Sequence, residues 1–124
     1  MKKVILVLGL TLFASMTFAQ EAPKFLRDTY PPCGLQSALE AMSVLNGSNA
    51  QLDAKTRELV ALGVAAQIPC VYCVYYHTKA ARANGATESE IREAVAAAAT
   101  VRQWSTVLNG MGYDFEAYKA EVGK

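Results

Sequence analysis

Residues 70–77 read Cys70-Val71-Tyr72-Cys73-Val74-Tyr75-Tyr76-His77, and they hold two of the chain's three cysteines and its only histidine. Pro69 precedes them and suits the first position of a helix, because the N–H that proline lacks would have no partner there. Side chains three and four residues apart are neighbours on a helix, so Cys70, Cys73 and His77 would share one face. The first turn would also place Cys70 at the positive end of the helix dipole, which favours a thiolate.

This cysteine pair admits three kinds of chemistry. Two Cα atoms three residues apart on a helix are separated by roughly 5 Å, which is within the range that a disulfide accepts. Such a pair can be redox-active, structural or metal-binding. His77, one turn beyond Cys73, favours the redox interpretation, because an imidazole can take the thiol proton or stabilise the thiolate.

Two metal-dependent alternatives are less well supported by the sequence. A structural zinc site would need a fourth ligand beside Cys70, Cys73 and His77, and Cys33 or Glu58 is the obvious candidate. Haem attachment requires a histidine directly after the second cysteine, where this chain has Val74. Haem attachment is therefore discarded, whereas a zinc site stays open as an alternative.

The segment before the cysteines predicts a buried helix. It opens at Asp53 and is apolar all round from Leu59 to Ala66, with Glu58 as the last charge before the apolar run. If the next helix returns antiparallel, Glu58 lies about 12 Å from the turn and His77 about 10 Å from it, at 1.5 Å per residue. We therefore expect Glu58 and His77 to face each other across the helix pair.

The remaining pattern is helical as well, and it predicts an all-α, single-domain bundle of about five helices over residues 35–124. Apolar residues recur at three- and four-residue spacing, and Asn-Gly pairs and a Thr87–Glu90 capping box mark the helix ends. Pro23, Pro31 and Pro32 predict an irregular segment over residues 20–34. The predicted helices cover 35–45, 53–66, 70–84, 87–108 and 114–122.

The first nineteen residues resemble a secretory signal peptide. Lys2 and Lys3 precede a short apolar core, and Thr17-Phe18-Ala19 suits cleavage before Gln20. A membrane anchor is the alternative, but the apolar stretch is short and interrupted by hydroxyl residues. We expect residues 20–124 to be exported to the periplasm or secreted, with no membrane attachment after signal removal. Disulfides can persist in those compartments.

The composition and net charge of the chain limit the classes of partner that it can bind. The chain has 124 residues, 52% of them hydrophobic, and a formal net charge of +1. A single core can therefore form, and no clustered basic face indicates nucleic-acid binding.

Glu58, Cys70, Cys73 and His77 together resemble the pattern of the alkylhydroperoxidase D-like branch of the carboxymuconolactone decarboxylase family. The resemblance covers about residues 35–110 and includes the twelve-residue interval from Glu58 to Cys70. It implies an all-helical fold, assembly into trimers or hexamers, and no metal or organic cofactor. It also implies that Cys70 and Cys73 form a redox disulfide while Glu58 and His77 relay protons.

The function implied is that of an exported thiol-dependent oxidoreductase of peroxidase or thiol–disulfide exchange type. Its substrate would be a small hydroperoxide or a disulfide, and a separate thiol protein would reduce it. Tyr72 is a departure, because some members carry a second histidine there. Cys33 is outside the family pattern, and we assign it a minor structural role.

Two alternatives stay open. One is a non-enzymatic helical module in which the Cys70–Cys73 bond or a zinc site is structural. The other is a decarboxylase-type member, although that branch lacks the dithiol.

Overall fold

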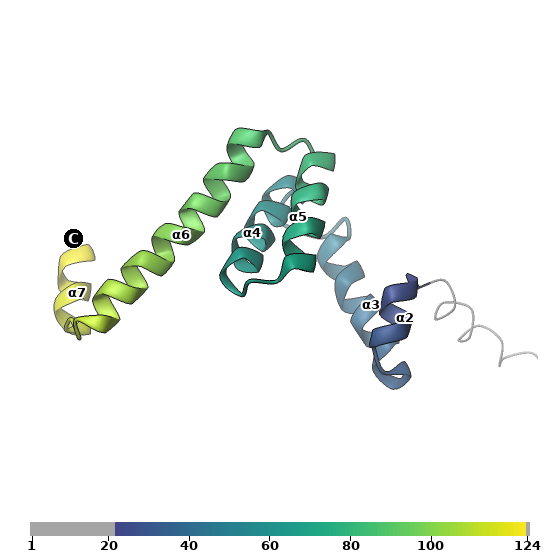
Figure 1. Cartoon of the computed structure of the whole chain (residues 1–124), viewed down its shortest axis with the longest axis horizontal. Helices are drawn as coiled ribbons and strands as arrows, with labels where there is room; N and C mark the ends of the chain where they lie inside the picture. Colours follow the sequence, from purple (N-terminus) through teal and green to yellow (C-terminus); the bar gives the residue numbers. More distant parts are fainter. Residues whose placement is uncertain (1–21, 124) are drawn as a thin grey trace, which may run out of the picture. The chain divides into compact units, whose positions relative to one another are not determined.

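The computed structural model describes residues 22–123, and within them the chain forms six helices and no strand (Figure 1). The all-helical prediction is confirmed. The described residues divide into two compact units, one ending at Ala50 and one beginning at Gln51. The predicted signal peptide, residues 1–19, lies outside the described part of the chain.

The first unit holds two helices, α2 (Lys24–Thr29) and α3 (Pro32–Asn46). The prediction of an irregular segment over residues 20–34 is wrong, because its prolines lie at helix starts rather than inside helices. Pro23 caps α2, Pro31 caps α3, and Pro32 occupies the first turn of α3. Proline is tolerated at these positions because the N–H groups there have no partner within the helix.

The second unit contains α4 (Ala54–Gln67), α5 (Val71–Ala83), α6 (Glu88–Gly110) and α7 (Phe115–Val122). A short turn joins α4 to α5, so the two helices run antiparallel side by side, and α6 packs against α4 (Figure 1). Leu62, Ala81 and Ile91, one from each of these three helices, form the buried core. The boundary at Ala50 differs from the predicted single domain over 35–124.

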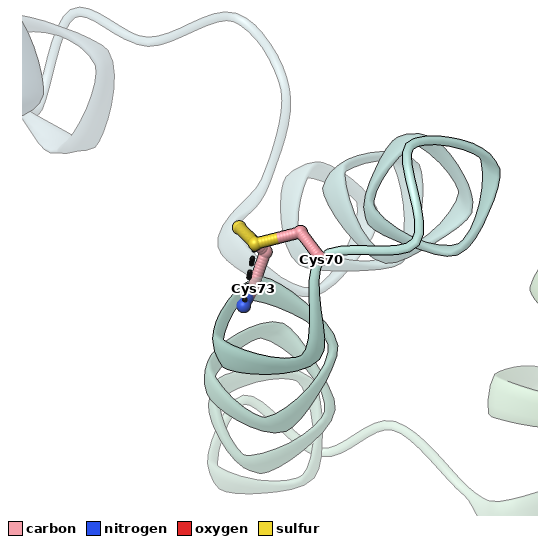
Figure 2. Close-up of a disulfide and its surroundings, with 2 residues drawn as sticks. All are labelled: Cys70 and Cys73. Atoms are coloured by element: carbon pink, nitrogen blue, oxygen red, sulfur yellow. Dashed lines mark hydrogen bonds between the residues drawn. A yellow bond between two sulfur atoms is a disulfide. The ribbon is translucent and has the colours of Figure 1, made fainter.

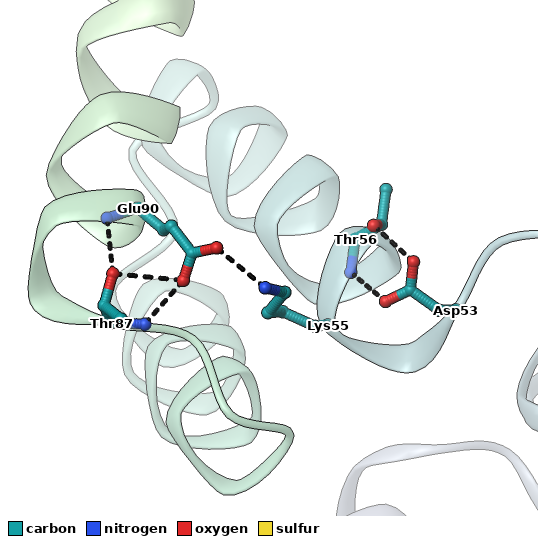
Figure 3. A network of polar contacts seen from close by, with 5 residues as sticks. All are labelled: Asp53, Lys55, Thr56, Thr87 and Glu90. Atoms are coloured by element: carbon teal, nitrogen blue, oxygen red, sulfur yellow. Dashed lines mark hydrogen bonds and ion pairs between the residues drawn. The ribbon is translucent and has the colours of Figure 1, made fainter.

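Polar contacts fix where α4 and α6 begin (Figure 3). Asp53 accepts a hydrogen bond from the Thr56 N–H at 3.0 Å, and Thr87 and Glu90 form the predicted capping box. Lys55 then joins the two helix starts, because its Nζ lies 2.7 Å from Glu90 Oε1. These contacts hold the first turn of α6 against that of α4.

The outer face of α4 differs from the prediction. An all-round apolar helix is expected to be buried on most sides, but Val60 is 57% exposed and Val64 is 56% exposed. Within a single chain, α5 and α6 cover only part of the helix. Among the described helices, none is both long enough and apolar enough to cross a membrane.

Candidate active site

The Cys70–Cys73 disulfide lies at the start of α5. Its Cα atoms are 5.2 Å apart, and both residues are half-buried. Figure 2 shows the Cys73 backbone N–H donating to Cys70 Sγ, at 3.2 Å. Cys70 is therefore the cap of α5 rather than a residue of its first turn, and Pro69 lies before the helix. A sulfur that receives a helix N-terminal N–H is stabilised as a thiolate when the bond is reduced.

A hydrogen-bonded pair of Glu58 and His77 lies between α4 and α5. Glu58 Oε2 is 2.7 Å from His77 Nδ1. Glu58 is only 8% exposed, and of the residues that the structure describes it is the only buried charged one. The predicted approach of these two side chains is confirmed, whereas their role in catalysis stays a prediction.

The pairing determines what the imidazole can do. A carboxylate only accepts hydrogen bonds, so the histidine nitrogen facing it, Nδ1, carries the hydrogen. In the neutral form of the imidazole, the other nitrogen, Nε2, has a lone pair with which to accept a proton. The Tyr76 ring meets the imidazole edge-on, with centroids 5.1 Å apart, and helps to hold its orientation. His77 is also four residues after Cys73, so both lie on the same face of α5.

A bracing contact that the sequence analysis missed holds the turn before Cys70. Arg102 of α6 donates to the Gln67 side chain at 2.8 Å and to its backbone carbonyl at 3.2 Å. Gln67 in turn donates to the carbonyl of Ala98. Gln67 is the polar residue that directly follows the apolar run of the second predicted helix, and its place there was the available signal.

Glu58, one candidate for a fourth zinc ligand, pairs with His77. Cys33 is a free, exposed thiol in α3, within the first unit. Across residues 22–123, no three His, Cys, Asp or Glu side chains are grouped so as to hold a metal ion. The zinc alternative therefore gains no support from the geometry.

Comparison with known proteins finds sequences similar to this chain. A sequence model of the carboxymuconolactone decarboxylase family matches residues 31–114. A protein of Paracoccus denitrificans described as "Uncharacterized protein 4 in cox locus" is 37% identical over 68 residues. That alignment covers 55% of this chain and 61% of the relative's length.

Proposed function

The chain belongs to the carboxymuconolactone decarboxylase family, and from this premise we propose that it is a thiol-dependent oxidoreductase. The Cys70/Cys73 pair cycles between dithiol and disulfide. The observation that carries the proposal is the Glu58–His77 pair, with 2.7 Å between its atoms, one helical turn beyond Cys73. A structural disulfide has no need of a buried carboxylate that orients an imidazole on the same helix face.

The proposed reaction with a hydroperoxide starts from the dithiol. His77 Nε2 takes a thiol proton, and the thiolate attacks the terminal peroxide oxygen. The O–O bond breaks, the alcohol leaves with a proton returned by the imidazolium, and a cysteine sulfenic acid remains. The second thiol attacks that sulfur and releases water as the disulfide forms. Two electrons have then moved from the dithiol to the peroxide, and an external thiol reductant restores the dithiol.

A disulfide substrate uses the same groups. The thiolate attacks one substrate sulfur and forms a mixed disulfide, and the second thiol resolves it. Each step exchanges one S–S bond for another, so the substrate leaves as two thiols.

We also propose that the enzyme is exported and acts as a trimer or hexamer. Lys2, Lys3 and Thr17-Phe18-Ala19 support export. The exposed apolar residues on α4 and α6 support assembly.

Turnover by cysteine variants tests the proposed activity. The reduced protein is given tert-butyl hydroperoxide or a small disulfide, with a thiol reductant, and product is quantified. Cys70→Ser and Cys73→Ser should each abolish catalytic cycling, because each variant lacks one sulfur of the disulfide. Cys33→Ser is the matched control and should turn over like wild type.

The same assay separates the alternatives. Wild-type protein that reduces neither substrate contradicts the proposal and favours a structural disulfide. Lactone decarboxylation that survives both active-site serine variants favours the decarboxylase alternative.

A further inference from the structure

An open groove of about 640 Å³ runs along one side of α5 and is not part of the redox site described above. Pro69 and Val71, the neighbours of Cys70 on both sides, line one end of it. Val71, Val74 and Thr78 follow at three- and four-residue spacing, so the groove follows one stripe of the helix. One end of the groove therefore lies next to Cys70 along the chain, although neither Cys70 nor Cys73 lines it, and the groove extends toward the C-terminal end of α5.

The two ends of the groove differ in polarity. Pro69, Val71 and Val74 make the end beside the disulfide apolar. Lys79 and Arg82 line the far end. A ligand that fits this lining has an apolar body and a charged end.

The two cations at the far end are not equivalent. Arg82 is held by Glu88 through two hydrogen bonds of 2.6 and 3.1 Å, so its charge is already balanced. Lys79 is exposed and has no ion-pair partner among residues 22–123. Lys79 is thus the cation that remains to receive an anion.

The length of the groove sets the size of the ligand. Eight residues separate Val71 from Lys79, which is about 12 Å along the helix at 1.5 Å per residue. An extended acyl chain of medium length spans that distance. Its carboxylate would meet Lys79 while its other end reaches the residues that flank Cys70.

We propose that this groove binds anionic amphiphiles and makes medium-chain carboxylic acid hydroperoxides the preferred substrates, with the carboxylate at Lys79 and the peroxide near the Cys70–Cys73 pair. This inference rests on the proposed function for the reaction. The overall reaction is the one proposed above for a hydroperoxide: the dithiol becomes a disulfide, the hydroperoxide becomes an alcohol, and water is released. The acyl chain lies against Val71 and Val74, where burial of its methylene groups supplies the binding free energy.

Binding of an unreactive probe tests the groove without any turnover. Laurate, below its micelle concentration, is titrated into the oxidised full-length protein by calorimetry, with lauryl-trimethylammonium as the oppositely charged probe. Laurate should bind and the cation should bind more weakly. Lys79→Glu should weaken laurate binding about tenfold, because an exposed attraction becomes a repulsion. Lys119→Glu, the matched control in α7, should bind laurate like wild type.

Turnover then tests the substrate class. The kcat/KM for a fatty-acid hydroperoxide divided by that for tert-butyl hydroperoxide should fall about tenfold in Lys79→Glu and stay at the wild-type value in Lys119→Glu. If laurate does not bind, or binds equally to Lys79→Glu and Lys119→Glu, the proposal that this groove binds anionic amphiphiles is wrong. Failure to reduce any hydroperoxide, together with normal laurate binding, overturns the substrate assignment alone. Failure to reduce a small disulfide as well overturns the proposed function.

Discussion

Glu58 is costly to bury unless its carboxylate is paired. An ionised carboxylate removed from water needs a hydrogen-bonding partner, and a single imidazole supplies it here. We therefore propose that the two residues act as a unit, in which Glu58 orients the ring and His77 moves the proton. The sequence predicted this approach from helix rise alone, because both distances from the turn are set by 1.5 Å per residue.

Loss of either member should slow the thiol chemistry. We expect His77→Gln, which keeps a donor for Glu58 but cannot accept a proton, to slow the reaction with peroxide near neutral pH by roughly 10²–10⁴-fold. Glu58→Gln should act in the same direction. The double variant should slow dithiol oxidation by less than the product of the two single fold-changes, since the residues act together. Stopped-flow measurement of dithiol oxidation gives the three rates.

The control for that experiment is Glu93→Gln, an exposed glutamate of α6. It should react like wild type. If His77→Gln also reacts at the wild-type rate while remaining folded by circular dichroism, the relay is wrong.

At Cys70 the sequence prediction was off by one position, and the reason is local. The Cys70 N–H donates to the carbonyl of Ala65 at 3.2 Å, so it closes the end of α4 instead of beginning α5. Residue spacing indicated that a helix starts near Pro69. Residue spacing could not show that the turn is tight enough for the Cys70 N–H to donate to a carbonyl of the preceding helix.

At the scale of single helices, Gly63 is a position in α4 where a substitution should stabilise the fold. A Cβ added there would lie 3.6 Å from Ala98 Cβ and 3.8 Å from the Ala94 carbonyl oxygen, which is ordinary contact. Glycine inside a helix is less favourable than alanine because it loses more backbone freedom on folding. We expect Gly63→Ala to raise the free energy of unfolding by about 0.5–1 kcal/mol, as measured by urea titration.

The same substitution at Gly85 is the matched control and should act in the opposite direction. Gly85 follows α5 with a φ of 85°, in the left-handed region that side chains with a Cβ disfavour. Gly85→Ala should lower the free energy of unfolding by about 1 kcal/mol. A destabilising Gly63→Ala would show that α4 and α6 lie closer together than the structure places them.

The start of α6 should respond to acid through Glu90. Hydrogen bonds from Lys55, and then from the Thr87 N–H and hydroxyl, lower the pKa of Glu90 from 4.5 to about 2. A lowered carboxyl pKa stabilises the fold above pH 4.5, and this contribution is lost as the pH falls toward about 2. Glu90→Gln should therefore have a lower Tm than wild type at pH 7, with a gap that narrows below pH 4.5.

Thermal scans by circular dichroism at several pH values measure that gap. Glu93→Gln again serves as the control and should show no such narrowing. A gap that stays constant from neutral pH to pH 2 would contradict the assigned role of the Lys55–Glu90 contact.

The element predictions succeeded where local chemistry decides a boundary. Asp53, the Thr87–Glu90 capping box and Gly85 mark helix ends through contacts within a few residues, so the sequence alone indicates them. The short helix α2 was missed for the opposite reason. Its six residues carry no periodic apolar stripe, and its flanking prolines are compatible with either a helix start or an irregular segment.

At the scale of the whole molecule, the chain should assemble with copies of itself. Val101 is 70% exposed and Trp104 is 56% exposed on α6, Met111 directly after α6 is 80% exposed, and the outer face of α4 is exposed as well. Isolated monomers rarely present apolar surface on this scale. We expect trimers or hexamers at micromolar concentration, the number following from the family resemblance.

Multi-angle light scattering measures the assembled mass. Trp104→Arg should shift the population toward smaller species, whereas Arg27→Gln in α2 should not. A wild-type mass equal to one chain would contradict the prediction of assembly.

Sequence pattern indicated the apolar surface of α4 but not its exposure. Periodicity shows that a face must be covered, and it does not distinguish coverage by the same chain from coverage by another. For the same reason, the expectation of a single bundle over 35–124 did not reveal the division after Ala50.

The reduction potential of the Cys70/Cys73 pair tests the central claim most directly. It is measured by equilibrating the protein with thiol–disulfide redox buffers and quantifying the dithiol, in the Cys33→Ser background and with a zinc assay alongside. A redox-active pair should have a potential above about −300 mV and contain no zinc. A potential below about −300 mV, or one zinc ion per chain, would contradict the account and assign the cysteines a structural role.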